Sequence, residues 1–204
     1  MIDDFCRYFI CFMVFSFIGW LYESLFYSVQ LKRWVNSGFL HGFICPIYGA
    51  GGMLLMIFFG GLQDLRMIFL AGALVCAILE YFISWLLEYV FDARWWDYSD
   101  WPLNINGRVC AVSILGFGFA SLIGTQFIIP FVFGGVAAMS TVQLHFITAL
   151  MVIGLMIDLG YTLKTMDREE KEPWFIEEHS EMMEKRTSEL NAKLDEIKRM
   201  IRRD

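Results

Sequence analysis

Residues 67–90 read MIFLAGALVCAILEYFISWLLEYV, an apolar run whose only formal charges are Glu80 and Glu88. An α-helix needs about 20 mostly apolar residues to cross the hydrocarbon core of a bilayer, and this run is long enough. An open sheet edge at the same depth would leave backbone groups unpaired in lipid. The stretch therefore predicts a membrane-spanning helix in an all-α membrane protein.

Further apolar runs predict that the chain crosses the membrane about five times. The expected spans cover residues 5–29, 43–62, 67–90, 109–130 and 142–163. The second run is the least regular, because Pro46 and the glycines after it favour a kinked or broken start. After the fourth run, Pro130, Gly134 and Gly135 are the expected turn, and a re-entrant piece within 131–141 is left open.

Composition supports a membrane protein and excludes several soluble classes. The 204 residues are 57% hydrophobic and 19% charged, whereas soluble domains average about 45–50% apolar and about 25% charged. The net charge of −6 and the lack of a basic run argue against nucleic acid as a partner. The five cysteines show no CxxC spacing, so neither a disulfide framework nor a zinc site is expected, and any cofactor is unknown.

Basic residues in the short loops predict the orientation. With five spans, one side of the membrane holds Lys32, Arg33, Arg94, Arg108 and the charged C-terminal stretch. The more positive side is normally the cytoplasmic one. We therefore expect a multi-pass plasma-membrane protein with its N-terminus outside and its C-terminus in the cytoplasm.

The chain divides into a transmembrane helical domain, 1–165, and a cytoplasmic charged helix, 166–204. In the second part Ile176, Met183, Leu190 and Ile197 recur every seven residues, which is the spacing of a coiled coil. Two readings are open. The helix is either an amphipathic segment folded back on the membrane domain or a short coiled coil that pairs two copies of the chain.

Acidic side chains within the spans point to a polar cluster. A charge inside a bilayer costs at least about 2.5–3.5 kcal/mol on insertion scales. Glu23, Glu80, Glu88 and Asp158 all fall at mid-depth or in the predicted cytoplasmic half. Glu80, Ser84 and Glu88 follow at i, i+4 and i+8, and so share one helix face.

Two carboxylates from different helices, with Arg94 or Arg108 between them, would form a self-neutralising cluster. Such a cluster is either architectural or a site for an ion, a proton or a ligand. Two carboxylates held close together raise the pKa of one of them, which suits proton coupling.

Two irregular stretches border this cluster. Residues 94–102 (RWWDYSDWP) form either an aromatic belt at the headgroups or the wall of a pocket for a headgroup, sugar or cation. Residues 38–49 (GFLHGFICPIYG) predict irregular backbone, which a membrane tolerates only against protein or a cavity. The candidate binding residues are Glu23, Tyr48, Glu80, Glu88, Arg94, Trp95, Trp96, Asp97 and Arg108.

Several of these pieces together resemble one protein family. The motifs are Gly19-Trp20-Leu21-Tyr22-Glu23, Gly38-Phe39-Leu40, Cys45-Pro46-Ile47-Tyr48-Gly49, Glu80-Tyr81 with Ser84 and Leu87-Glu88, Arg94 to Ser99, and Asn104 with Gly107-Arg108. Over roughly residues 10–165 they resemble the bacterial ABC-transporter permeases of type IV, the CmpB-like integral membrane proteins. The resemblance implies a transporter permease, without a substrate or catalytic residues.

A permease of this class implies partners. The chain has no GxxxxGK[ST] phosphate loop, so a separate ATPase subunit would be required, with residues 30–42 or 91–108 as the element that contacts it. Five spans are few for one pore-forming chain, which implies a homo-oligomer, a dimer, in the lipid bilayer. Two other classes stay open: a membrane enzyme acting on lipid headgroups, and a scaffold or sensor that signals through its C-terminal helix.

Overall fold

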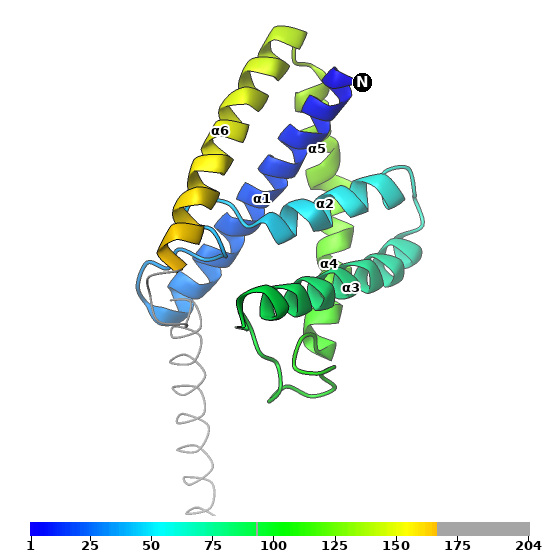
Figure 1. Cartoon of the computed structure of the whole chain (residues 1–204). Coiled ribbons are helices and arrows are strands. Elements are labelled where there is room, and N and C mark those ends of the chain that lie inside the picture. Colours follow the sequence, from blue (N-terminus) through cyan, green and yellow to red (C-terminus); the bar gives the residue numbers. More distant parts are fainter. Residues whose placement is uncertain (93, 167–204) are drawn as a thin grey trace, which may run out of the picture.

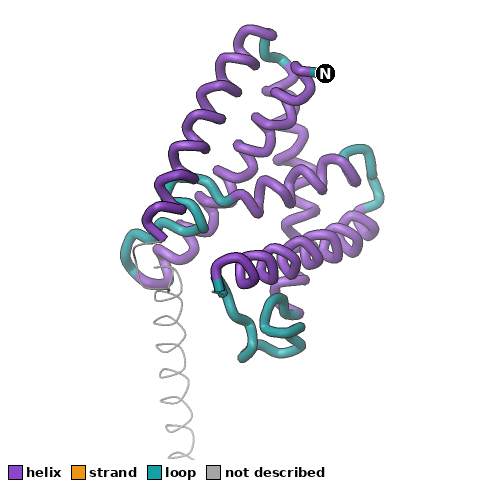
Figure 2. The backbone as a smooth tube through the Cα atoms, in the orientation of Figure 1, coloured by secondary structure: helices purple, strands orange, loops and turns teal. Residues whose placement is uncertain are grey.

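The fold is that of a computed structural model, which describes residues 1–92 and 94–166. Its regular elements within those residues are all helices, joined by loops (Figures 1 and 2). In chain order they are α1 (Ile2–Leu31), α2 (Pro46–Phe59), α3 (Leu65–Phe91), α4 (Ala111–Ile123), the π-helical turn η1 (Gly124–Ile128), α5 (Ile129–Ala137) and α6 (Thr141–Met166). The heptad pattern predicted for the C-terminal helix lies outside the described residues.

Four stretches are long and apolar enough to cross a membrane: Ile2–Leu31, Leu65–Phe91, Ala111–Ala137 and Thr141–Thr165. They confirm the prediction of an all-α polytopic membrane protein. The second predicted span, 43–62, is instead the shorter apolar helix α2. At 1.5 Å per residue, its 14 residues cover only part of a hydrocarbon core of about 30 Å.

The helices are arranged so that two ends of the molecule can be distinguished (Figure 1). α1 and α6 run away from the end that holds the N-terminus, and α4, η1 and α5 return toward it as one column. α2 and α3 lie side by side in opposite directions and cross this framework obliquely. The N-terminus and the turn at 138–140 therefore share one end, and the end of α6 lies at the other, with the 32–45 connection.

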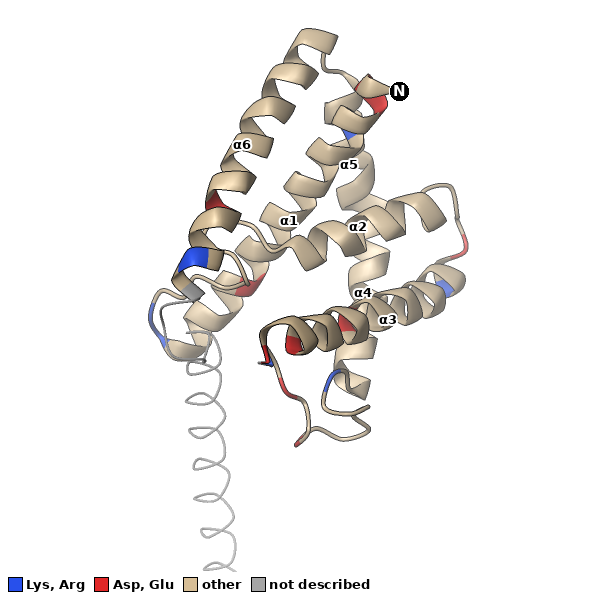
Figure 3. Cartoon of the chain, viewed as in Figure 1, with Lys and Arg blue, Asp and Glu red and all other residues tan. Residues whose placement is uncertain are grey.

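The outer surface of the bundle is largely apolar. The column of α4, η1 and α5 carries no Lys, Arg, Asp or Glu (Figure 3), and its Phe131 is 84% exposed. α6 likewise exposes large apolar side chains such as Phe146 and Ile157. Contiguous apolar surface of this kind suits a lipid surrounding rather than water.

α2 is short because the chain before it is held in a non-helical path. Pro46 takes the first turn of α2, where its missing N–H leaves no bond unmade, and Cys45 is extended. Residues 35–45, here called the lead-in segment, run beside α1 instead. The N–H groups of this segment donate to α1: Val35 to Ser28 Oγ at 2.9 Å, Ser37 to Ser24 Oγ at 3.1 Å and Cys45 to the Ser16 carbonyl at 3.0 Å.

α6 holds the lead-in segment from another side. The Asp158 carboxylate accepts the Gly42 N–H at 3.0 and 3.1 Å, and the Thr162 hydroxyl accepts the His41 N–H at 3.2 Å. A side chain at position 42 would collide with Asp158. The structure thus confirms irregular backbone before Pro46 and shows it packed against protein, the setting in which a membrane tolerates it.

The turn predicted at Pro130, Gly134 and Gly135 is wrong. The helix continues to Ala137 and reverses at residues 138–140, so the fourth span is longer than 109–130 and no re-entrant piece begins at 131. Pro130 fits because η1 directly precedes it, closed by the Ile129 N–H donating to the Gly124 carbonyl. This wider turn relieves the clash between the proline ring and the preceding backbone.

Small residues set the close contact between α1 and α2. Tyr48 lies directly against Gly19, and Gly49 lies against Ser16 and Phe12. The small side chains of Ser16 and Gly19 are what permit this close approach of the two helices. The contact fixes Tyr48 and the start of α2 one turn away from Glu23.

Replacing Gly49 by alanine should destabilise the protein, because the new Cβ would strike Ser16 Oγ and lie 2.8 Å from the Phe12 ring. Such overpacking costs about 1–3 kcal/mol. The matched control is Gly51→Ala in the same helix, where the nearest atom is Leu79 Cδ2 at 3.7 Å and alanine should be neutral or stabilising. Thermal unfolding in detergent compares the two, and equal midpoints would contradict the packing described.

Candidate functional site

The carboxylates of α3 lie on the face that meets the loop 92–110. Glu80 and Ser84 are 8% and 3% exposed, and Glu88 follows one turn later. The stripe predicted from their spacing is therefore present. Its members nevertheless meet different partners, and the single cluster that the sequence suggested separates into two groups.

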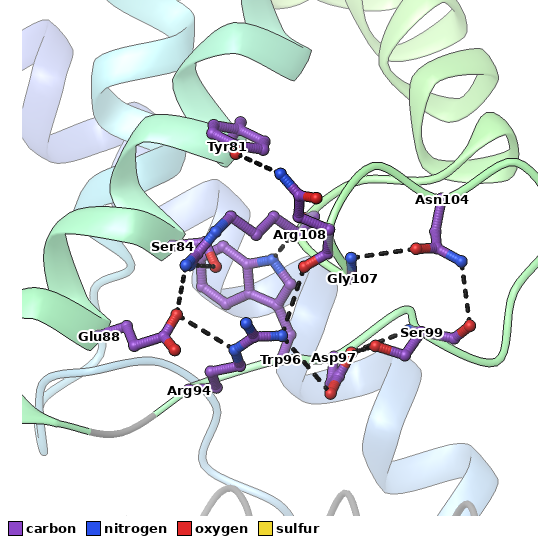
Figure 4. A network of polar contacts seen from close by, with 11 residues as sticks. Tyr81, Ser84, Glu88, Arg94, Trp96, Asp97, Ser99, Asn104, Gly107 and Arg108 are labelled. Atoms are coloured by element: carbon purple, nitrogen blue, oxygen red, sulfur yellow. Dashed lines mark hydrogen bonds and ion pairs between the residues drawn. The ribbon is translucent and has the colours of Figure 1, made fainter.

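The loop 92–110 brings together residues from both of its ends. The Tyr98 N–H donates to the Gly107 carbonyl at 2.7 Å, which folds the loop back on itself. Gly107 has φ +69°, and a side chain there would collide with Asp97, so glycine is required. Arg94 and Arg108 consequently reach the same side of α3 (Figure 4).

The first group is an ion-pair network around Glu88. Its carboxylate accepts the Arg94 Nε–H at 3.1 Å and pairs with the Arg108 guanidinium. Arg108 also donates to the Ser84 hydroxyl at 3.1 Å and stacks over the Tyr81 ring, 5.7 Å from its centroid. Arg108 is 8% exposed, so its guanidinium N–H groups mainly contact protein and are hardly accessible to a ligand.

Asp97 completes the network at its outer edge. Its carboxylate lies 3.8 Å from Arg94 Nη1 and accepts the Ser99 N–H at 2.8 Å. Arg94 also donates to the Asn106 carbonyl at 3.3 Å. The two arginines thus balance Glu88 and Asp97, and neither arginine lies between Glu23 and Glu80 as the sequence suggested.

The two tryptophans fasten this loop to the protein. Trp95 is 5% exposed and packs against Phe39 and Phe91, with ring centroids 5.5 and 5.4 Å away. Trp96 Nε1 donates to the Arg108 carbonyl at 3.0 Å. Both side chains therefore pack within the protein, which does not support the reading of residues 94–102 as a belt at the headgroups.

The second group lies around Glu23 and Glu80. Tyr98 donates to Glu80 Oε1 at 3.2 Å, and the Cys45 thiol donates to Glu23 Oε2 at 3.4 Å. The two carboxylates, one from α1 and one from α3, are close enough to act on each other electrostatically, and Tyr27 is near both. We call Glu23, Tyr27, Tyr48, Glu80 and Tyr98 the acid–tyrosine group.

Two polar atoms in this region have no hydrogen-bond partner among the described residues. Glu80 Oε2 is one, and the hydroxyl of the fully buried Ser37 is the other. Ser37 and Tyr48 both lie beside Glu23, although the Ser37 hydroxyl is not in hydrogen-bonding geometry with any described group. A buried polar atom without a hydrogen-bond partner destabilises the protein. A bound group that donates a hydrogen bond to each of these two oxygens would remove that cost.

Tyr98 acts as a protonated phenol that donates a hydrogen bond, and not as a charged phenolate. Burial, and then the nearby Glu80 carboxylate, raise the pKa of Tyr98 far above its ordinary value. The phenol therefore stays protonated at any physiological pH and donates to Glu80. Within the described residues, no group of three or more His, Cys, Asp or Glu side chains is suited to a metal ion.

Sequence reasoning anticipated part of this arrangement. Tyr27 follows Glu23 by one turn, and this spacing alone places the two residues on the same face of α1. The contact of Tyr98 with Glu80 depends on the fold of the loop, and no spacing in the sequence indicates it. Ser37 was missed because a serine in a glycine-flanked stretch looks like an ordinary loop residue.

Comparison with known proteins identifies one family. Its sequence model, described as "Putative ABC-transporter type IV", matches residues 10–163. The match runs from α1 into the last turns of α6 and contains every candidate residue of both groups. Searches among curated proteins and among solved structures give no match.

Removing Arg108 should loosen the loop 92–110 more than removing Arg94. Breaking a buried ion pair costs about 3–5 kcal/mol, and an exposed one about 0.2–1 kcal/mol. Arg108 is buried but its partner Glu88 is 33% exposed, so we expect about 2–3 kcal/mol for Arg108→Ala. For Arg94→Ala, at 36% side-chain exposure, we expect under about 1 kcal/mol.

Amide hydrogen exchange of the loop measures the difference. Protection of residues 94–110 should fall in the Arg108 variant and stay near wild type in the Arg94 variant. Equal loss of protection in both would mean that the exposed pair holds the loop as firmly as the buried one.

Proposed function

We propose, on the premise that the chain belongs to the ABC-transporter type IV family, that it is a transport protein of the plasma membrane in which Glu23 and Glu80 contact a cation or a proton. The family and the four apolar spans support a multi-pass transport-type protein. The chemistry of the acid–tyrosine group supports the assignment of a positively charged species.

One observation carries the proposal: Glu80 is 92% buried, and its Oε2 has no hydrogen-bond partner among the described residues. Glu23 lies near it, and no described basic side chain forms an ion pair with either carboxylate. Buried carboxylates need a compensating charge or a proton. Since the described part of the protein supplies neither a Lys nor an Arg there, a cation or a proton from outside it fills this role.

The network around Glu88 has a different part in this proposal. Arg94 and Arg108 are already paired with Glu88 and Asp97, which leaves little positive charge for an anionic headgroup. We assign these four residues to holding the loop 92–110 on α3, with no direct contact to the transported species.

Lys32 and Arg33, just before the lead-in segment, and Arg94 and Arg108, in the loop 92–110, favour the cytoplasmic side of the membrane for both connections. On this orientation the N-terminus lies outside, the C-terminus lies inside, and the acid–tyrosine group is nearer to the cytoplasm. The same face would receive a separate ATPase subunit, and a dimer would complete the pathway. Both partners follow from the family and from the small number of spans.

Charge displacement on a solid-supported membrane tests the cation site without requiring an ATPase. Proteoliposomes of the full chain are given concentration jumps of Na⁺, K⁺ and methylammonium, and steps of pH. At least one of these should give a transient current, because a cation entering the site displaces charge. Glu80→Gln and Glu23→Gln should reduce that current to the level of empty liposomes.

Asp100→Asn is the matched control, since Asp100 is an exposed acid of the loop. It removes one negative charge at the surface and should leave the current unchanged. A current that survives in both glutamine variants, or no current in response to any of the four probes, would contradict the proposed function.

ATP hydrolysis tests the partner. The chain purified in mild detergent from cells that express it at native level should carry a subunit with a phosphate-binding loop and hydrolyse ATP. Asp92→Lys, a charge reversal at an exposed acid on the face assigned to this partner, should lower the amount retained. A chain that moves its cation down an ion gradient with no ATPase attached would instead be a secondary transporter.

A further inference from the structure

If the acid–tyrosine group binds a cation, as the proposed function holds, its unpaired oxygens and its tyrosine rings indicate which chemical class of cation it binds. Its unfilled acceptors are Glu80 Oε2 and the Ser37 hydroxyl. Ser37 lies beside Glu23, and Glu80 is near enough to Glu23 for the two carboxylates to interact electrostatically. A ligand with two or three N–H donors would satisfy these atoms together with the Glu23 carboxylate.

Ser37 is tied to Glu23 by the geometry of the lead-in segment. Its N–H is fixed to Ser24 on α1, the residue next to Glu23. The following Gly38 packs on the Cys45 sulfur, which donates to Glu23 Oε2. The serine hydroxyl is thus held at the acid by two independent contacts of its own segment, while it is not in hydrogen-bonding geometry with any described group.

The tyrosines provide aromatic faces for a cation. Tyr48 lies near Glu23, Tyr27 and Tyr98, and Tyr27 lies near both carboxylates. An ammonium group over a tyrosine ring gains about 0.5–2 kcal/mol, more as water is removed. Tyr27, Tyr48 and Tyr98 are each partly exposed, so the group is not sealed by the described chain.

A metal ion fits this group less well. Calcium takes six to eight oxygen ligands, and zinc takes at least three side chains of the His, Cys, Asp or Glu type. The described residues hold no such set of three. A quaternary ammonium ion has no N–H group and would leave Glu80 Oε2 and the Ser37 hydroxyl unpaired.

We propose that the acid–tyrosine group, together with Ser37, binds the protonated amine of a small organic molecule. The –NH₃⁺ group donates to Glu23, Glu80 Oε2 and the Ser37 hydroxyl, with the tyrosine rings around its carbon side. One ammonium neutralises one of the two carboxylates. The second carboxylate keeps a proton, so binding one ammonium and one proton leaves the site without net charge.

Ligand-induced stabilisation tests this assignment. The full chain in lipid nanodiscs is heated with methylammonium chloride, and separately with tetramethylammonium chloride and sodium chloride at the same ionic strength. Methylammonium should raise the unfolding midpoint by roughly 2–4 °C in a saturable manner. The other two salts should give no saturable shift.

Variants locate the effect. Glu80→Gln keeps the size of the side chain and should abolish the methylammonium shift, and Ser37→Ala should weaken it. Asp100→Asn, a surface acid, should retain it in full. A shift that persists in Glu80→Gln, or an equal shift with tetramethylammonium or sodium, would overturn the proposal.

The two proposals fail in different ways. If sodium or a pH step gives a Glu80-dependent current while methylammonium gives no shift, the transport role stands and the amine assignment is wrong. If methylammonium raises the unfolding midpoint through Glu80 but is not carried into sealed proteoliposomes, the amine site stands and the transport role is wrong.

Discussion

The carboxylates carried by the apolar helices α1 and α3 must be neutralised, and the arrangement of the loop 92–110 and of the acid–tyrosine group depends on this constraint. Glu88 meets it with Arg94 and Arg108, and those contacts determine how the loop 92–110 folds back on α3. With both arginines used in this way, Glu23 and Glu80 share a region whose described polar neighbours are phenols, thiols and serines. The functional proposal rests on this unequal division of charge.

A second constraint comes from the backbone. A non-helical segment at membrane depth must find partners for its N–H groups within the protein, and the lead-in segment finds them on α1 and α6. This arrangement shortens α2 and places Ser37 and Cys45 beside Glu23. It also explains Asp158, an acid within α6 whose oxygens accept a backbone N–H rather than face a ligand.

The sequence predicted the class of fold well because apolar length and helical spacing are local properties. The runs at 5–29, 67–90 and 142–163 correspond closely to α1, α3 and α6. Pro130 misled the prediction, since a proline usually ends a helix and no local signal announces the π-helical turn that accommodates it. The sequence indicated the candidate acids because a charged side chain inside a bilayer costs free energy. Their division into two groups could not be predicted, because it depends on the loop 92–110. The fold of that loop depends on contacts between residues distant in the sequence.

A high-resolution cryo-EM map of the full chain in native-lipid nanodiscs, with a bound antibody fragment to aid alignment, tests the central claim most directly. The account predicts non-protein density between Glu23, Glu80 and the Ser37 hydroxyl, within hydrogen-bonding distance of Glu80 Oε2. It predicts no such density between Glu88 and Arg108, whose groups are already paired. A closed interior in which protein donors occupy both oxygens of Glu80 and of Glu23 would contradict it and leave the acids with a purely architectural role.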